Sequence, residues 1–340
     1  MFLIYNVKFL IISVFAYLSL LVLHVILKTV TNVHSVMNEI SYKGVTIMKI
    51  GVVHFGCASA GTAQIVRTLV EELSIQGHTV IGIEWNDKTK QLYRKELNRN
   101  TYHSFGTDSY LFNAFPITIW NDHLSVLAGE LIELDQVILL GDTKVNVNDF
   151  SGKFLQVPIS IFNNIKDSEL TLGYDTALNS IVENIERVRD TASSLSYGKV
   201  RVFNVQIPGK QSSALLHDTA LAVEAELVEQ VDSSSITRLK QHIKQKELNN
   251  EGYTFFMMDQ AVDPVVLEEH FREFDLDWKV VVIDESQCSG PYPTALDRLL
   301  ANQLKRAIVE WSTANQPSGQ LIIKNKKVAL KETSNSEGIK

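Results

Sequence analysis

Cysteine is scarce in this chain of 340 residues, which contains only Cys57 and Cys288. Two cysteines exclude a disulfide framework and a cysteine-based metal cluster, so the folded part is expected in a reducing compartment such as the cytosol. Dense runs of basic residues are also missing and the net charge is −7, which excludes nucleic acid as an expected partner. The chain also lacks an internal repeat of fixed period and a long low-complexity linker.

The sequence is rich instead in apolar segments that alternate with amphipathic ones from Lys49 onward. Hydrophobic residues make up 45% of the chain and charged residues 21%, an ordinary globular balance. Continuous apolar runs such as KIGVVHFG at residues 49–56 and KVVVID at 279–284 predict buried strands. Buried strands separated by helices predict a mostly parallel sheet covered by helices on both faces. Because the alternation recurs in two halves, we expect an α/β fold with two lobes of similar size and a cleft between them.

Residues 1–47 form a separate segment with a different composition. Residues 9–27 carry no acidic or basic side chain apart from His24, and nineteen helical residues span about 28 Å, roughly one bilayer core. The lysines around this run favour a cytoplasmic location for the domain that follows. Two interpretations stay open: residues 9–27 are a single transmembrane helix, or Met48 is the true start and a wrong start was assigned. We expect a folded domain over residues 48–331 and a disordered tail over 332–340.

The most informative stretch runs through residues 157–194, where a strand, a polar turn and a helix follow one another. It reads VPISIFNNIKDSELTLGYDTALNSIVENIERVRDTASS and resembles the bacterial-type phosphofructokinases, which transfer the γ-phosphate of ATP to fructose 6-phosphate. The positions that match the family without a gap are Pro158, Ile161, Asn163, Thr171, Gly173, Thr176, Ala177, Leu178, Arg189, Asp190, Thr191, Ser193 and Ser194. The similarity covers nearly everything from Met48 to about Lys331, and it implies the two-lobed phosphofructokinase-like fold.

The resemblance implies ATP and Mg²⁺ as cofactors, but the turn departs from the family at its chemistry. Phosphoryl transfer needs carboxylates for the metal, a base for the attacking hydroxyl and cations around the moving group. The family places its catalytic base and a second aspartate where this chain has Phe162 and Asn164. A phenyl ring cannot accept a proton, and a neutral amide is a poorer ligand for a hard cation. We therefore expect no catalytic residue in this turn.

The two phosphate loops of the family are altered as well. In the first loop the outer glycines match Gly56 and Gly61, whereas the inner one is Cys57. The helix that follows can still hold an anion at its N-terminus, and the alternative is a plain strand-to-helix turn. In the second loop Asp142 stands at the metal position, although it can instead be a turn residue or pair with Lys144. The resemblance thus implies cofactor binding by these two loops and a metal at Asp142.

The cations that hold the sugar phosphate in the family are mostly replaced. The arginine of its Met-Gly-Arg motif matches Lys210, which is the predicted substrate-binding residue. A lysine cannot reproduce the bidentate contact of an arginine. The sugar-phosphate loop of the family falls on residues 285–291, where Ser286 and Ser289 stand in place of its histidine and arginine. A fructose 6-phosphate molecule would be held poorly by this set.

Three further positions match the effector site that the family builds between subunits. Arg67, Arg189 and Glu226 fall on contacts for a nucleoside diphosphate or phosphoenolpyruvate. The alternative is that they form an ordinary ion-pair network at an interface. The resemblance also implies allosteric control and a homo-oligomer, or a hetero-oligomer with an active phosphofructokinase.

Three functions remain open from the sequence. The first is a catalytically impaired family member, a pseudoenzyme that binds a phosphorylated small molecule or a partner subunit. The second is a working 6-phosphofructokinase of glycolysis with a rebuilt site, and the third is a membrane-tethered scaffold that uses only the surface of the fold. Loss of both turn carboxylates favours the first.

Overall fold

The computed structural model describes residues 28, 47–56, 59–98, 113–123, 127, 129–141, 147, 152–194, 198–210, 213–314 and 316–332. The chain divides into two compact units, Met1–Ile47 and Met48–Lys340. The transmembrane helix expected at residues 9–27 and the tail beyond residue 332 lie outside the described residues. Within those residues, no helix is both long enough and apolar enough to cross a membrane.

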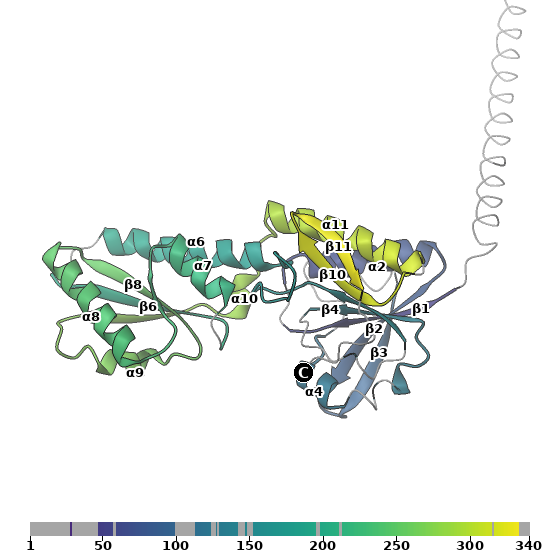
Figure 1. Ribbon diagram of the computed structural model, residues 1–340, viewed down its shortest axis with the longest axis horizontal. Coiled ribbons are helices and arrows are strands. Elements are labelled where there is room, and N and C mark those ends of the chain that lie inside the picture. Colours follow the sequence, from purple (N-terminus) through teal and green to yellow (C-terminus); the bar gives the residue numbers. More distant parts are fainter. Residues whose placement is uncertain are drawn as a thin grey trace, which may run out of the picture. The chain divides into compact units, whose positions relative to one another are not determined.

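The larger of two sheets in the second unit has seven strands in the order β11-β10-β5-β4-β1-β2-β3 (Figure 1). Its strands are β1 (Lys49–His54), β2 (Thr79–Asn86), β3 (Gln91–Leu97), β4 (Gln136–Leu140), β5 (Lys153–Val157), β10 (Gly319–Lys324) and β11 (Lys327–Glu332). The five inner strands pair in parallel, whereas β3 and β11 are antiparallel to their neighbours at the two edges.

The smaller sheet has four parallel strands in the order β7-β8-β6-β9. These are β6 (Arg201–Ile207), β7 (Glu226–Val228), β8 (Tyr253–Asp259) and β9 (Asp277–Val282). The expected α/β fold with mostly parallel sheets is confirmed. The expectation of two lobes of similar size is wrong, because the hairpins β2–β3 and β10–β11 add antiparallel edge strands to the larger sheet only.

Helices cover both faces of each sheet. The bounds are α2 (Thr62–Ile75), α4 (Ile117–Asp122), α6 (Tyr174–Ser193), α7 (Ala214–Ala222), α8 (Ser233–Leu248), α9 (Pro264–Glu269), α10 (Glu285–Cys288) and α11 (Ala295–Thr313). Apolar residues of α2 and α11 form the core on one face of the larger sheet, and α4 contributes to the other. The smaller sheet lies between α6 with α7 and α8 with α9.

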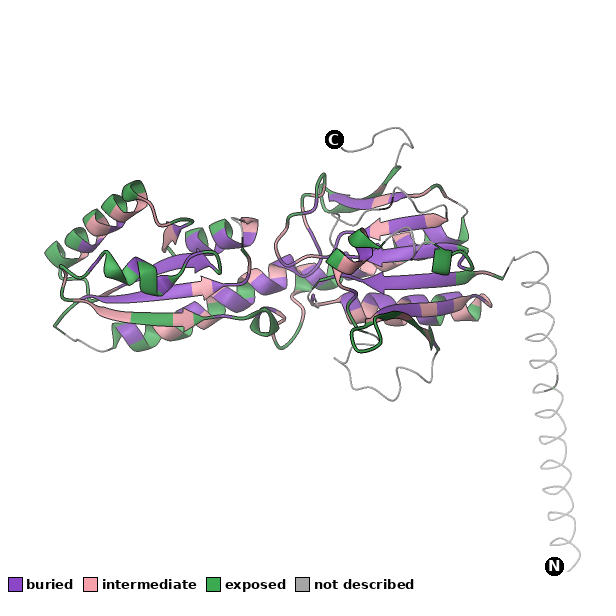
Figure 2. Ribbon diagram, turned by 90° about the horizontal axis from the view of Figure 1, so that it is seen from below, coloured by how far each residue is buried: buried purple, intermediate pink, exposed green. Residues whose placement is uncertain are grey.

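The burial of β1 on both faces explains why its middle residues are apolar. Ile50 and Val52 pack with α2 and α11, whereas Val53 and Phe55 face the opposite core. A strand buried on both faces has no polar side to display. Figure 2 shows the same pattern as continuous purple along the inner strands.

The start of β1 is tied to its neighbours by two polar contacts. The Met48 backbone N–H donates to His78 Nδ1 at 3.2 Å, and the Lys49 N–H donates to Asp135 Oδ2 at 2.7 Å. We therefore expect the domain to fold when residues 1–47 are removed, with a melting temperature close to that of the full chain. A truncation that also removes residues 48–50 is the control, and it should unfold at a clearly lower temperature. Aggregation of the shorter deletion, or a large fall in its melting temperature, would contradict this domain boundary.

His78 gives this contact a pH dependence. The imidazole is buried and its Nδ1 accepts a hydrogen bond, so burial lowers the pKa of His78. The unfolded chain, with an ordinary histidine pKa near 6.5, then binds the proton more readily, so this contribution to stability is lost as the pH falls below about 6.5. Urea unfolding at pH 7.5 and 5.5 should show a smaller loss of stability in His78→Gln than in the wild type. The exposed His270, changed to Gln, is the control and should leave the loss unchanged.

Candidate functional site

Three loops of the larger sheet begin at the same level, at the carboxyl ends of β1, β4 and β5. Register pairs His54 with Leu140 and Leu140 with Val157, so the strand ends lie side by side. Gly141 follows β4 with φ of 130°, and a Cβ there would lie 2.7 Å from the Phe55 carbonyl oxygen, so only glycine fits. Ligands of parallel α/β sheets bind at such carboxyl ends.

The first loop leads into the N-terminus of α2, where the N-cap residue of the described part of the loop has no side chain to cap the helix. Gly61 is the N-cap residue with φ of 94°. Ser59 and Thr62 beside it are 4% and 3% exposed, and neither hydroxyl has a hydrogen-bond partner. A helix N-terminus attracts anions because its first N–H groups point outward. Gly56 stands before this loop, and Cys57 lies outside the described residues.

A hollow of about 320 Å³ lies beside this helix N-terminus. It is lined by Ser59, Ala60, Gly61, Ala63 and residues 289–293. The hollow thus joins the loop that matches the nucleotide phosphates to the end of the loop that matches the sugar phosphate. None of these described lining residues is acidic or basic, so the hollow offers donors to an anion but no proton acceptor for catalysis.

The turn after β5 is held by its own side chains. The strand β5 ends at Val157, because Pro158 lacks an N–H and the chain beyond it pairs Ile159 with Leu172. Ser160 Oγ donates to Asn164 Oδ1 at 2.8 Å and accepts from the Phe162 N–H at 3.1 Å.

The middle of this turn carries no ionisable group. Phe162 packs, partly buried, against the core that contains Ile161 and Tyr174. Asn163 adopts φ of 51°, which asparagine tolerates, and its amide donates to the Glu169 carbonyl at 3.1 Å. Where the resemblance places the two carboxylates of the family, this chain has the apolar side chain of Phe162 and the amide of Asn164, which already accepts a hydrogen bond from Ser160.

Asp297 is a buried carboxylate that was not predicted from the sequence. It accepts hydrogen bonds from the N-terminus of α6 rather than holding a ligand. It is fully buried and accepts from the Gly173 N–H at 2.9 Å, the Thr176 N–H at 2.8 Å and Thr176 Oγ1 at 2.5 Å. Burial raises the pKa of Asp297. The Thr-x-x-Asp pattern from Thr294 to Asp297 predicts a cap at the start of α11. It does not predict that Asp297 also accepts hydrogen bonds from the start of α6. The N-terminus of α6 is thus already filled by an anion of the chain, whereas no described side chain caps that of α2.

The predicted substrate contacts lie at the carboxyl ends of the smaller sheet. Lys210 follows β6 and is exposed, and the Gly209 carbonyl beside it accepts from the Gln260 N–H at 2.9 Å. Ser286 lies in the first turn of α10, which Asp284 and Gln287 cap, and its Oγ donates to Asp284 Oδ1 at 2.5 Å. That hydrogen bond holds the pKa of Asp284 below its usual value.

Contacts within the chain engage the predicted effector residues Arg189 and Glu226. Arg189 forms an ion pair with Glu186 at 3.2 Å, donates to the Val223 carbonyl and lies 5.4 Å from the centre of the Phe255 ring. Glu226 pairs with two side chains of α8, and this cluster is described further below. Arg67 lies on α2, over the larger sheet, whereas Arg189 and Glu226 lie at the smaller sheet. Asp142, the predicted metal ligand, lies outside the described residues.

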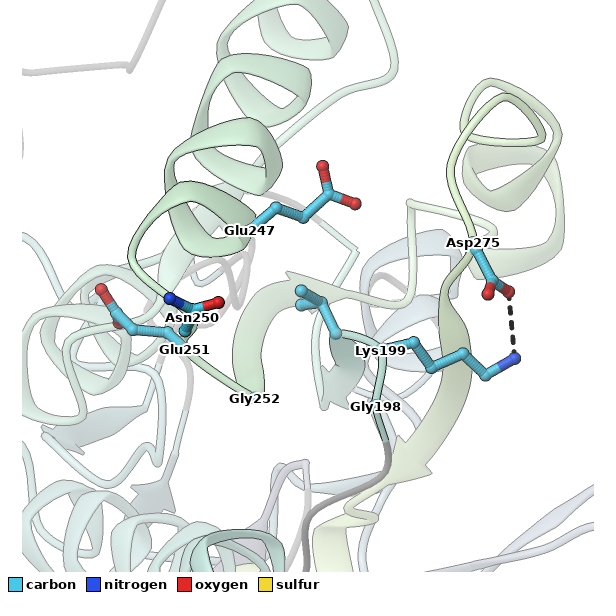
Figure 3. Close-up of a pocket in the computed structure, with 8 residues that line it drawn as sticks. Gly198, Lys199, Glu247, Asn250, Glu251, Gly252 and Asp275 are labelled. Atoms are coloured by element: carbon cyan, nitrogen blue, oxygen red, sulfur yellow. Dashed lines mark hydrogen bonds and ion pairs between the residues drawn. The ribbon is translucent and has the colours of Figure 1, made fainter.

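A second hollow, of about 380 Å³, opens in the smaller sheet at the amino-terminal ends of β6, β8 and β9 (Figure 3). It is lined by Gly198, Lys199, Val200, Glu247, Asn250, Glu251, Gly252 and Asp275. Figure 3 shows Lys199 extended toward Asp275, with which it pairs at 3.2 Å. Three of the lining side chains are acidic and the one cation is already paired, so this hollow does not suit a phosphate.

The strand-end loops and the helix beside them define an α/β protein with a candidate ligand site where such folds carry one. Comparison with known proteins gives the family. The phosphofructokinase family model matches residues 134–312, which is more than half of the chain. The chain therefore belongs to the phosphofructokinase family.

Individual relatives agree with this assignment. The chain is 26% identical over 288 residues to an ATP-dependent 6-phosphofructokinase of Natranaerobius thermophilus, covering 79% of this chain and 87% of that protein. Phosphofructokinase from Saccharomyces cerevisiae has the same fold, with a TM-score of 0.66, 20% identity and coverage of 86% of this chain but 44% of the yeast chain. A pyrophosphate-dependent phosphofructokinase from Marinobacter aquaeolei is similar with a TM-score of 0.62 at 13% identity, covering 86% of this chain and 84% of that one.

Proposed function

We propose that this chain binds a phosphorylated small molecule at the hollow beside α2 and transfers phosphate poorly or not at all. The observation that carries the proposal is the contrast between two neighbouring features. The N-terminus of α2 has buried hydroxyls without partners next to a hollow, whereas the turn after β5 holds no ionisable side chain from Ile161 to Ile165.

The loss of chemistry follows from what the turn contains. Without a base, the attacking sugar hydroxyl keeps its proton, and loss of a general base costs about 10²- to 10⁴-fold in rate. Mg²⁺ prefers carboxylate oxygens, and this turn offers only the amides of Asn163 and Asn164. These described residues do not fit the magnesium site that the family implies. Binding of ATP through Gly56, Cys57, Gly61 and Asp142 stays a prediction, and so does sugar binding through Lys210.

An anion at α2 can be tested by placing a negative charge in the first turn of the helix. Ala63 lines the hollow, and Ala63→Glu would repel a phosphate while suiting the positive end of the helix dipole. Phosphoenolpyruvate or ADP at 100 times its dissociation constant should stabilise the wild type by about 2.7 kcal/mol. The shift in melting temperature should disappear in Ala63→Glu and persist in Ala63→Gln, which has the same size without the charge. Equal shifts in all three forms, or none in the wild type at millimolar ligand, would contradict the proposed site.

Assembly and regulation belong to the same proposal. An effector between subunits would use Arg67 of one copy with Arg189 and Glu226 of another, and it would have to compete with the contacts that Arg189 and Glu226 make within the chain. A homo-oligomer, or a hetero-oligomer with an active phosphofructokinase, would supply such a neighbour. A cytoplasmic location of the domain likewise stays a prediction, and a role as a membrane-tethered scaffold depends on residues 9–27.

A working 6-phosphofructokinase with a rebuilt site is the alternative function. It is favoured by the names of relatives such as the Natranaerobius enzyme, which is called ATP-dependent. The rate measurements described in the Discussion separate it from the impaired protein.

A further inference from the structure

His242 of α8 lies between two strands of the smaller sheet. Its Nδ1 lies 3.0 Å from Glu226 Oε1 on β7, and its Nε2 lies 2.8 Å from Thr254 Oγ1 on β8. The side chains of His242 and Glu226 are 22% and 27% exposed, and Thr254 is buried. The three groups therefore form a chain of two hydrogen bonds that fastens the middle of α8 to the edge of the sheet.

This arrangement keeps both hydrogen bonds whether or not the imidazole carries a second proton. A carboxylate only accepts, so Nδ1 bears a hydrogen in either state. A threonine hydroxyl both donates and accepts, so Thr254 can serve Nε2 in either state by rotating its hydrogen. Protonation consequently changes the charge of the clamp and leaves its geometry in place. The carboxylate of Glu226 then faces a cation rather than a neutral ring, and charge-assisted hydrogen bonds are the stronger kind.

The charged groups around His242 decide the sign of the effect. Glu226 also pairs with Arg238, and Lys246 pairs with Glu251. Both Arg238 and Lys246 lie on the same helix as His242. The ring of Phe256 lies with its centre 6.3 Å from that of the His242 ring, and the two planes are steeply inclined. The hydrogen bond from His242 is the main cause that lowers the pKa of Glu226. Two acidic and two basic side chains balance, so the proton on His242 adds one net positive charge beside Glu226.

We propose that His242 is a proton-operated clamp, which holds α8 on the β7 edge more tightly at acidic pH and keeps Glu226 bound within the chain. The inference does not depend on the proposed phosphate site. The family resemblance gives the position of Glu226 to an effector. The proposal instead assigns Glu226 to a contact within the chain whose strength depends on pH.

A double-mutant cycle of His242→Gln and Glu226→Gln tests the clamp. Urea unfolding of the four forms at pH 5.5 and 8.5 gives the coupling between the two residues at each pH. We expect the coupling at pH 5.5 to exceed that at pH 8.5 by about threefold in the unfolding equilibrium, the scale of a partly exposed ion pair. The control cycle pairs Arg238→Gln with Glu226→Gln. Its coupling should be the same at both pH values, because the guanidinium stays charged. Equal coupling in the His242 cycle at the two pH values would overturn the proposal.

A second measurement keeps the test sharp if the double variant unfolds. Native-state hydrogen exchange of α8 amides, corrected for the intrinsic effect of pH, reports local opening of the helix. In the wild type the protection of α8 amides from exchange should fall by about threefold between pH 5.5 and 8.5. In Glu226→Gln the protection should be the same at both pH values. Parallel behaviour of the two forms would also overturn the clamp.

Discussion

Supplied with fructose 6-phosphate, ATP and Mg²⁺ at saturating concentrations, the protein is expected to release ADP at least about 10²-fold more slowly than an ordinary kinase, whose turnover is roughly 1–100 s⁻¹. Phe162 stands where the base of the family stands and packs against the core of the smaller sheet. Asn164 offers an amide that Ser160 already uses. A coupled assay of ADP release measures this, and a turnover within tenfold of the ordinary range would contradict it.

Restoring the two carboxylates is expected to recover only part of the rate. Phe162→Asp with Asn164→Asp returns a base and a metal ligand, but Lys210, Ser286 and Ser289 still replace the cations and the histidine that hold the sugar phosphate. The Michaelis constant for fructose 6-phosphate should therefore stay far above that of an active relative assayed beside it. Full activity of the double variant would show that the sugar phosphate is held by residues not considered above.

Asp297→Ala is expected to cause the largest loss of stability of any single substitution considered. The change leaves the N–H groups of Gly173 and Thr176 buried without an acceptor. Each of these two buried donors that loses its partner costs about 1–3 kcal/mol, so the free energy of unfolding should fall by about 2–6 kcal/mol. Urea unfolding at neutral pH measures the loss.

The control for this substitution is Asp263→Ala. Asp263 is exposed and caps the short helix α9 by accepting from the Val265 N–H at 2.8 Å. Removal of an exposed N-cap costs about 0.5–2 kcal/mol, less than we expect at Asp297. Similar losses in the two variants would show that Asp297 is an ordinary cap and does not fix the start of α6.

The sequence alone was sufficient to predict the inner strands and to recognise the family. The run QVILL in β4 is apolar after its first residue, and RVFNVQI in β6 keeps apolar side chains that point to both faces, which favours strands buried on both faces. An aspartate followed by proline is a helix-start pattern that can be recognised in the sequence, and in the structure Asp263 caps α9 with Pro264 in the first position. These features depend on neighbours along the chain, and the resemblance at residues 157–194 supplied the rest of the fold.

Features that depend on contacts between distant parts of the chain could not be predicted from the sequence. The helix α8 escaped notice because few of its residues are buried: only Leu239 and Ile243. The clamp at His242 joins it to Glu226 and Thr254, which lie on two different strands. Asp297 looked like part of the α11 cap, and only the packing of α11 beside Gly173 showed that it serves α6. Where the sequence allows two roles for a side chain, the residues that the fold places next to it decide which role it has.

The central claim is that this member of the phosphofructokinase family binds phosphate without transferring it, and a single-turnover experiment tests it most directly. The protein is mixed in excess with ATP, Mg²⁺ and fructose 6-phosphate, and fructose 1,6-bisphosphate is quantified after quenching, with thermal stabilisation by ligand recorded on the same sample. We predict stabilisation by the phosphorylated ligand and product that forms at least about 10²-fold more slowly than with an active relative measured beside it. Stoichiometric product within about one second, the time of an ordinary kinase turnover, would contradict the account.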